Sequence, residues 1–374
     1  MEKVFVIGAT AKSLVNFRGE LLRSMVKNGF EVTAISPEGS PEEVEKIKEL
    51  GVNYKSIPLL RTSINPLIEL KTFFNYFILF RKYEPDHLLC YTIKPVIWSG
   101  LALLFTSRKV NFTALITGLG YAFEGNSLKR KLLRFIVVSL YKISLTKSNN
   151  VIFQNNDDLN FFHNEGVVSA SKCSVVPGSG VPMDYFSRKD LPDMQPFKFL
   201  MVSRLLKEKG VFQYVDAARM IRNKYSNVEF HLVGGLDLSH DGITKYTLAE
   251  WEKEGTIIYH GEQNDVRPYL NDCHVFVLPS YYREGLPRTI LEAMAIGRPI
   301  LTTDNVGCRE PVDAGNNGWL VPIKDSVALA DRMQWFLENK DKIENMSLFG
   351  YETVKERYDV RKINKSMMEI MGII

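Results

Sequence analysis

The feature that most constrains this chain of 374 residues is a strand-and-helix alternation that starts at the amino terminus and starts again in the second half. Residues 4–8 and 31–36 have the apolar composition of buried strands, and the helical segment 17–28 between them ends at Gly29, a favoured residue after a helix. Parallel strands connected by helices form doubly wound sheets. The first half is therefore predicted to be a Rossmann-like domain.

A second alternating series begins near residue 197. Its strands are expected at 197–203, 228–233, 256–260, 274–279 and 299–303, and its helices at 210–225, 244–254 and 287–296. Residues 175–192, which precede this series, are rich in proline, glycine, serine and aspartate, as turns are. We therefore predict an α/β protein with two Rossmann-like domains, one over residues 1–185 and one over residues 190–355.

Length and composition agree with this organisation and limit where the protein works. A chain of this length, with 45% hydrophobic residues, can bury two cores and leave a cleft between them. The four cysteines lie far apart, which fits a reducing cytoplasm, and the six histidines lack metal-ligand spacing. No segment offers the ~20 mostly apolar residues that cross a bilayer. We expect a cytoplasmic enzyme that needs no metal and no bound cofactor.

Two Rossmann-like domains first suggest a dehydrogenase or a kinase. The sequence has no G-x-G-x-x-G after its first strand and no G-x-x-x-x-G-K-[ST]. Neither class is supported.

The most informative stretch is PSYYREGLPRTILEAM at residues 279–294, where a strand ends and a helix is expected to start at Pro287. The free amides and the positive end of that helix would face a ligand at the carboxyl end of the sheet, and a diphosphate fits that position. Glu284, in the loop, could accept hydrogen bonds from hydroxyls of a transferred sugar. Glu292, in the helix, could do the same for two neighbouring ribose hydroxyls.

Positive charge for such a diphosphate is offered by SRLLKEKG at residues 203–210, a strand-to-helix turn. Arg204 could bind phosphate oxygens as a fork and Lys209 as a point charge, and Lys207 is a further cation in the same turn.

These residues carry a family resemblance. Glu284 and Glu292 match the E-x7-E pattern of the retaining glycosyltransferases of family 4, which have the GT-B fold, and Arg204 and Lys209 match that family's R-x4-K position. The resemblance covers essentially the whole chain, including NFR at 16–18 and ITGLGY at 116–121. In particular, the chain is similar to bacterial enzymes that add hexoses or N-acetylhexosamines to undecaprenyl-diphosphate-linked sugars.

The resemblance implies a UDP-sugar donor, a lipid-diphosphate-linked saccharide as acceptor, and retention of the anomeric configuration. A terminal helix over about 356–374 would pack back on the first domain. By the resemblance, Glu292 would bind the ribose of the donor and Glu284 its sugar. Arg204 and Lys209 would bind the diphosphate. The rest of the donor site would be formed by Gly285, Leu286 and Pro287.

The first domain offers further candidates. Asn16 and Arg18 are expected where the loop after the first strand enters its helix, so they could bind the acceptor pyrophosphate or simply cap their own helix. Many members of the family that the chain resembles have a histidine in the central acceptor-side loop, but none lies near residues 116–121 here. Lys94 and Glu124 are therefore the candidates for contacting the sugar from the first domain. A structural or surface charge is the alternative for both.

The first half also carries excess positive charge, with 14 Lys and Arg residues against four acidic ones over residues 55–147. Residues 66–80 and 132–145 are apolar on every side, and the second of these segments follows the cations KRK at 129–131. Such helices are either fully packed in a core or partly in contact with lipid. We expect peripheral contact with the anionic inner face of the plasma membrane.

Three rival functions remain open. One is a phosphorylase or sugar-nucleotide epimerase of related fold, which would turn over a free UDP-sugar, and another is a GT-B enzyme with a soluble acceptor. The third is a non-catalytic basic protein that binds a membrane or nucleic acid. Because a binder of polyanions gains nothing from acids such as Glu284 and Glu292, we expect no nucleic-acid partner.

Overall fold

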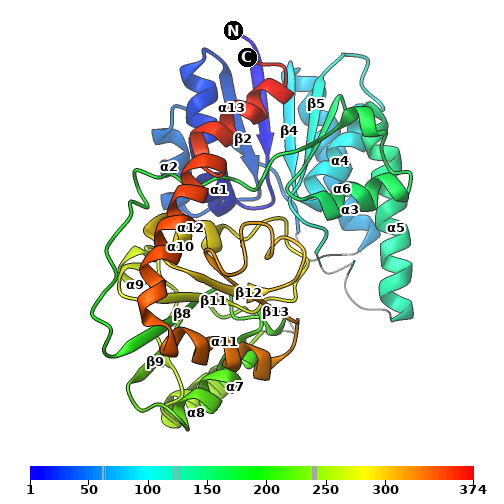
Figure 1. Ribbon diagram of the computed structural model, residues 1–374. Coiled ribbons are helices and arrows are strands. Elements are labelled where there is room, and N and C mark those ends of the chain that lie inside the picture. The colour runs from blue at the N-terminus through cyan, green and yellow to red at the C-terminus, as the bar shows by residue number, and fades with distance from the viewer. Residues whose placement is uncertain (61–62, 64, 121–122, 124–126, 238–241) are drawn as a thin grey trace. The chain divides into compact units, whose positions relative to one another are not determined.

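The computed structural model describes residues 1–60, 63, 65–120, 123, 127–237 and 242–374 (Figure 1). The chain forms two compact units, one made of Met1–Ser179 and Val360–Ile374 and the other of Gly180–Asp359. It leaves the first unit within the turn-rich segment 175–192 and returns to it after Asp359. The first unit is therefore built from both ends of the chain.

Among its described residues, the first unit has a seven-stranded parallel sheet with the order β3-β2-β1-β4-β5-β6-β7. The order runs outward from β1 in one direction and from β4 in the other, so the sheet is doubly wound. The strands are β1 (Lys3–Ile7), β2 (Glu31–Ser36), β3 (Asn53–Ser56), β4 (His87–Tyr91), β5 (Asn111–Ile116), β6 (Asn150–Phe153) and β7 (Cys173–Val175).

Helices cover both faces of this sheet. They are α1 (Ala11–Lys27), α2 (Pro41–Glu49), α3 (Pro66–Tyr83), α4 (Ile93–Leu103), α5 (Leu128–Ser144), α6 (Asn156–Asn164) and α13 (Val360–Ile370). Successive side chains of a strand point to opposite faces. Val4 and Val6 of β1 accordingly join the core under α1, α2 and α13, and Phe5 and Ile7 join the core under α3, α4, α5 and α6.

The terminal helix α13 belongs to the first unit, where it packs on α1 (Figure 1). Met367 is completely buried in the core under these helices. Just beyond the helix, the Nδ2 of Asn111 donates a hydrogen bond of 2.6 Å to the carbonyl of Met371. The last residues of the chain are thus part of the first unit's fold.

The second unit repeats the architecture, with a described six-stranded parallel sheet of order β10-β9-β8-β11-β12-β13. Its strands are β8 (Phe197–Val202), β9 (Val228–Val233), β10 (Ile258–Tyr259), β11 (Val275–Leu278), β12 (Ile300–Thr303) and β13 (Gly318–Val321). Its helices are α7 (Val211–Arg222), α8 (Lys245–Lys253), α9 (Arg267–Asn271), α10 (Arg288–Ile296), α11 (Ser326–Glu338) and α12 (Ile343–Arg357).

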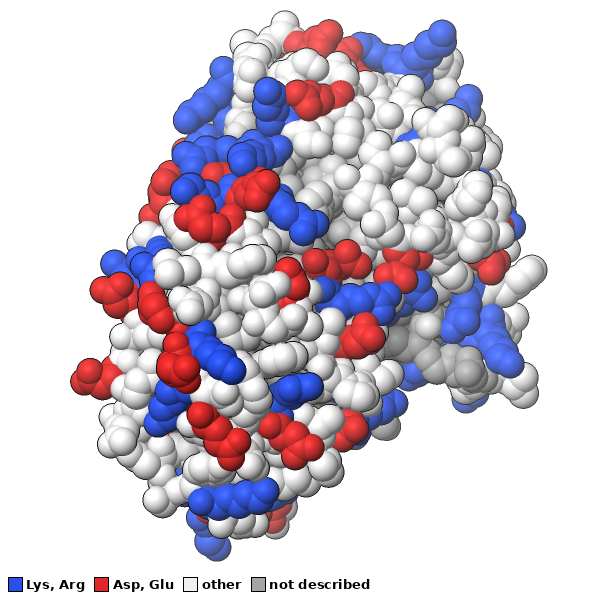
Figure 2. Space-filling model, viewed as in Figure 1, with Lys and Arg blue, Asp and Glu red and all other residues white. Residues whose placement is uncertain are grey.

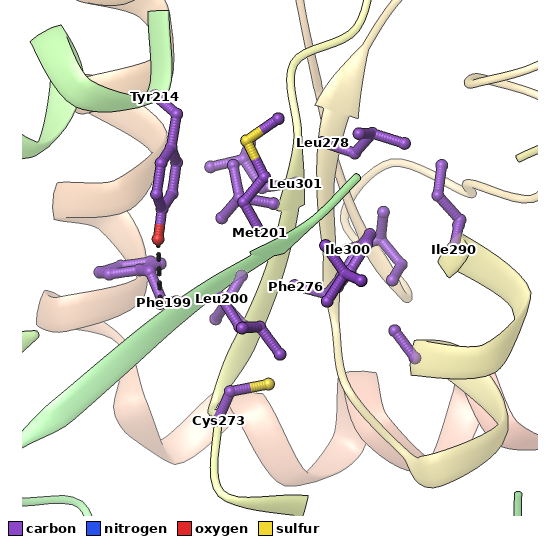
Figure 3. Packing of buried hydrophobic residues seen from close by; sticks show 14 of the residues in the cluster. Phe199, Leu200, Met201, Tyr214, Cys273, Phe276, Leu278, Ile290, Ile300 and Leu301 are labelled. Carbon is purple, nitrogen blue, oxygen red and sulfur yellow. Dashed lines mark hydrogen bonds between the residues drawn. The ribbon is translucent and has the colours of Figure 1, made fainter. Parts of the chain in front are cut away.

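The centre of this sheet is a dense apolar core (Figure 3). Side chains of β8, β11 and β12 meet there with Ile290 of α10. In the same view the hydroxyl of Tyr214 donates to the carbonyl of Phe199 at 3.0 Å. β8 and β11 are neighbours in space although they are not consecutive in the chain, so the strand order reverses between them. In open α/β sheets, ligands bind at the carboxyl ends of the strands beside such a reversal.

Candidate functional site

Two loops leave the carboxyl ends of β8 and β11 and contact each other. The backbone N–H groups of Tyr281 and Tyr282 donate to the carbonyl of Glu208, at 2.8 and 3.1 Å. Gly210 has a φ of +79°, and a Cβ atom on it would lie 2.0 Å from the carbonyl oxygen of Pro279. Only glycine fits there, because any side chain would push the two loops apart.

This contact brings together Lys209 and Glu284, two of the predicted site residues. The Nζ of Lys209 lies 2.6 Å from the Oε1 of Glu284, and the side chains are only 11% and 14% exposed. The hydroxyl of Ser280 donates to the same carboxylate oxygen at 3.0 Å. A cation and a carboxylate are therefore held together, largely out of water, at the end of the sheet where a ligand is expected.

The loop that carries Glu284 is supported from β12. The amide of Asn305 donates to the carbonyl of Tyr282 at 3.0 Å, and the hydroxyl of Thr303 donates to the carbonyl of Ser280. A Cβ atom on Gly307 would lie 2.5 Å from the carbonyl oxygen of Gly285. The position of the Glu284 carboxylate is thus set by three neighbouring strands.

Glu292 lies in α10, which starts at Arg288. Pro287 is the residue before the helix, with a ψ of 114°, and not its first residue as predicted; Gly285, Leu286 and Pro287 are all buried. The Oε1 of Glu292 lies 2.9 Å from the Nε of Arg288, one turn earlier. Burial raises the pKa of Glu292 to about 7, and the positive charge of Arg288 opposes that shift.

Arg204 has a different partner from Lys209. Its Nη1 donates to Asp237, in the loop after β9, at 2.9 Å, and the arginine side chain is 45% exposed. Arg204 and Lys209 both follow β8, so they lie at the same edge of the sheet. Because β8 is the neighbour of both β9 and β11, their partners Asp237 and Glu284 lie at that edge too. The structure thus joins Lys209 directly to Glu284 and leaves Arg204 accessible beside Asp237.

In the first unit, Asn16 and Arg18 lie inside α1 and not at its start, so this placement was wrong. The helix begins at Ala11 because the side chain of Thr10 accepts a hydrogen bond from the N–H of Ser13. Arg18 is buried, with its guanidinium carbon 5.3 Å from the ring centre of Tyr91 and its Nη1 4.0 Å from the sulfur of Met367. These contacts give Arg18 a packing role, and its predicted contact with an acceptor stays a prediction.

Lys94 has three acceptors for its ammonium group. They are the carbonyls of Leu60 and Ser63, both at 2.6 Å, and the carboxylate of Glu69 at 2.5 Å. The indole of Trp98 donates to the other oxygen of Glu69 at 2.7 Å. All three N–H bonds of Lys94 are engaged, so a sugar would have to displace one of these acceptors. Glu124, the other candidate, lies outside the described residues.

Sequence reasoning missed Arg288, Ser280 and Asp237 as partners of the predicted residues. Arg288 could have been found from its i, i+4 spacing to Glu292. Within the described ranges, no group of three or more His, Cys, Asp and Glu side chains is arranged to hold a metal ion. No described helix is both long and apolar enough to cross a membrane.

Comparison with known families covers most of both units. Residues 184–353 match the family described as "Glycosyl transferases group 1", and residues 4–155 match the one described as "Glycosyl transferase 4-like". The N,N'-diacetylbacillosaminyl-diphospho-undecaprenol alpha-1,3-N-acetylgalactosaminyltransferase of Campylobacter jejuni is 29% identical over 341 residues, which are 88% of this chain and 87% of that protein. The UDP-Gal:alpha-D-GlcNAc-diphosphoundecaprenol alpha-1,3-galactosyltransferase of Escherichia coli is 26% identical over 79% of this chain and 77% of its own.

Solved structures share the fold along the whole chain. Sucrose-phosphate synthase from Thermosynechococcus elongatus superposes with a TM-score of 0.81 at 18% identity and covers 100% of this chain, with 98% of its own chain matched. Anabaena Alr3699/HepE, solved in complex with UDP, gives a TM-score of 0.78 at 17% identity, with 100% of both chains covered. At these identities the likeness concerns the fold alone.

Proposed function

Because the chain is a glycosyltransferase of the GT-B fold, with a 4-like first unit and a group 1 second unit, we propose that it is a retaining enzyme of bacterial polysaccharide assembly. It transfers a hexose or N-acetylhexosamine from a UDP-sugar to a lipid-diphosphate-linked saccharide. The observation that carries this proposal is the Lys209–Glu284 pair, at 2.6 Å, beside a helix that carries Glu292.

In this proposal, different site residues bind different parts of the donor. Glu292 accepts hydrogen bonds from the ribose hydroxyls, and Arg204 binds the diphosphate. When the donor enters, its sugar hydroxyls replace the ammonium of Lys209 on Glu284, and Lys209 turns to a phosphate oxygen. After the exchange each group of the nearly buried pair still has a polar partner, which avoids the cost of leaving a buried charge unpaired.

In the transfer step, the acceptor hydroxyl oxygen forms a bond to the anomeric carbon as the bond from that carbon to the diphosphate oxygen breaks. The proton of the acceptor hydroxyl passes to the leaving phosphate on the same face of the sugar, which gives retention. Lys209, Arg204 and the amides before α10 stabilise the negative charge of the departing diphosphate. An inverted product would contradict this step.

The substrates are proposed from the names of the relatives. The Escherichia coli relative is named for a UDP-Gal donor and a diphosphoundecaprenol-linked acceptor, and the Campylobacter relative for a diphospho-undecaprenol-linked acceptor. Each aligns with more than three quarters of this chain. A UDP-sugar and a polyprenyl-diphosphate saccharide are therefore the first substrates to test.

A donor screen tests this function. Purified protein is incubated with single UDP- and GDP-sugars and a short-chain polyprenyl-diphosphate saccharide, and the product is detected by its mass. We expect one UDP-sugar to add one sugar mass, and Glu292→Ala to lose at least 100-fold in rate, because the ribose loses a charged acceptor. The control is Glu250→Ala, at an exposed position of α8, which should keep the wild-type rate. Turnover of the donor without acceptor, or a Glu292→Ala variant of normal rate, would contradict the proposal.

We also propose that the first unit binds an anionic membrane surface through α3 and α5. Both helices pack on α4, and both expose apolar side chains at helical spacing. These apolar rows are Leu67, Leu70, Phe74 and Ile78 on α3, and Leu128, Leu132, Phe135, Ile136 and Ile143 on α5. Lys129 and Lys131 are exposed at the start of α5. Figure 2 shows basic side chains around that end of the helix, below a broad uncharged surface. Apolar rows beside cations are typical of interfacial helices.

The double variant Leu132→Ser/Phe135→Ser tests the membrane surface, since these side chains are 62% and 71% exposed. Burying each in lipid is worth about 1.5–3 kcal/mol, so partition onto phosphatidylglycerol-containing vesicles should fall more than about tenfold. Val327→Ser, at an exposed position of α11, is the control and should bind like wild type. Lys129→Glu/Lys131→Glu should remove the preference for phosphatidylglycerol over phosphatidylcholine. Unchanged partition of the serine variant would refute this surface.

A further inference from the structure

Arg288 occupies a position that helix electrostatics disfavours. It is the first residue of α10, where the helix dipole is positive, and the first turn contains no acidic residue. Pro287 provides no side-chain cap at this end. The arginine side chain is only 16% exposed, so water does little to screen its charge. A cation in this place requires a compensating partner, and the partner is Glu292.

The order and burial of the pair are unfavourable for stabilising the helix. In isolated helices an acidic residue that precedes a basic one by four positions is the better order, and here the order is reversed. Both side chains are nearly buried, with Glu292 12% exposed, and a buried pair repays its desolvation poorly. The Nε–Oε1 distance of 2.9 Å nevertheless places the guanidinium charge directly beside one oxygen of the carboxylate.

We propose that Arg288 is a positioning residue of the donor site, which holds the Glu292 carboxylate ionised and oriented for the ribose hydroxyls. This inference rests on the proposed function, which assigns the ribose to Glu292. A protonated carboxyl group carries its own hydrogen, so it cannot accept from both hydroxyls as a carboxylate does.

The charge state of Glu292 is finely balanced. Burial raises its pKa to about 7, and Arg288 is the charged group that lowers it. The elements packed on α10, namely α9, α12, β11 and β12, bring no other described charge that shifts it. Without Arg288 the pKa would rise further. Ribose binding should therefore weaken as the pH falls through 7, and the loss should begin at higher pH when Arg288 is removed.

The test compares Arg288→Met, Arg288→Lys and wild type in calorimetric titrations with UDP and with 2′,3′-dideoxy-UDP, between pH 6 and pH 9. In Arg288→Met we expect UDP affinity to fall about tenfold or more at pH 7 and to recover towards pH 9. The dideoxy nucleotide should change by less than about twofold, and Arg288→Lys should restore most of the UDP affinity. Thermal unfolding of each variant checks its folding separately.

Each alternative outcome has a distinct meaning. An equal loss for both nucleotides, or a loss that does not depend on pH, would place Arg288 on the phosphates or in packing and overturn the inference. If wild type prefers UDP over the dideoxy nucleotide and Arg288→Met keeps that preference, only the role of Arg288 fails. If wild type itself shows no preference, the ribose role of Glu292 fails, and the inference falls with it.

Discussion

Replacing Lys209 by methionine is expected to lower kcat by roughly 10²–10³-fold, the loss typical of removing one group that stabilises charge in a transition state. The side chain is nearly buried and lies at the carboxyl edge of the sheet, so its ammonium acts where water screens little. The leaving diphosphate gains negative charge as the glycosidic bond breaks. Steady-state kinetics with the donor found in the screen would measure the effect.

Lys209→Met should also lower the stability of the fold, and this effect needs its own control. Methionine leaves the Glu284 carboxylate without its ammonium partner, and an unpaired charge that is mostly buried costs several kcal/mol of stability. Lys209→Met/Glu284→Gln removes both charges, so it should unfold nearer the wild-type temperature and still have low kcat. Lys253→Met, at an exposed position of α8, should change neither quantity. A Lys209→Met enzyme within threefold of the wild-type kcat would remove Lys209 from the mechanism.

The donor-side site could be predicted from the sequence because it depends on the order of strands and loops along the chain. Arg204 and Lys209 follow one strand, and Glu284 follows another. The carboxyl ends of parallel strands share one edge, so spacing alone places these residues in one region. Sequence could not show that Lys209 and not Arg204 pairs with Glu284. That choice depends on the contact of Gly210 with Pro279, and thus on the neighbouring β8 and β11.

Predictions for the first unit were weaker because they depend on distant contacts. Lys94 contacts carbonyls at Leu60 and Ser63, more than 30 residues earlier in the chain, and no spacing rule reveals such partners. The start of α1 was missed for a local reason. Thr10 caps the helix, so it begins at Ala11 and not at residue 17 as predicted, and Arg18 lies within it, buried against α13.

The second large effect concerns stability. Arg298, two residues after the end of α10, is buried, and burial lowers its pKa, yet all five of its N–H groups donate to backbone carbonyls. The acceptors are the carbonyls of Leu270 at 2.8 Å, Asn271 at 2.9 Å, Asp190 at 3.0 Å, Lys189 at 3.1 Å and Gly297 at 3.2 Å. This guanidinium ties together the start of the second unit, the end of α9 and the end of α10.

Arg298→Met is therefore expected to destabilise the second unit by about 3–5 kcal/mol, because the stem still fits but five carbonyls, two of them in buried hydrogen bonds, lose a charged donor. In a unit of this size each kcal/mol corresponds to about 2–4 °C, so its unfolding temperature should fall by roughly 10 °C. Arg222→Met, at an exposed position of α7, should change stability by less than about 0.5 kcal/mol. Hydrogen exchange should localise the loss to residues 189–190, 270–271 and 297. A loss of protection confined to α10 would instead mean that Arg298 stabilises only the end of that helix. Measuring kcat well below the unfolding temperature separates this effect on stability from an effect on catalysis.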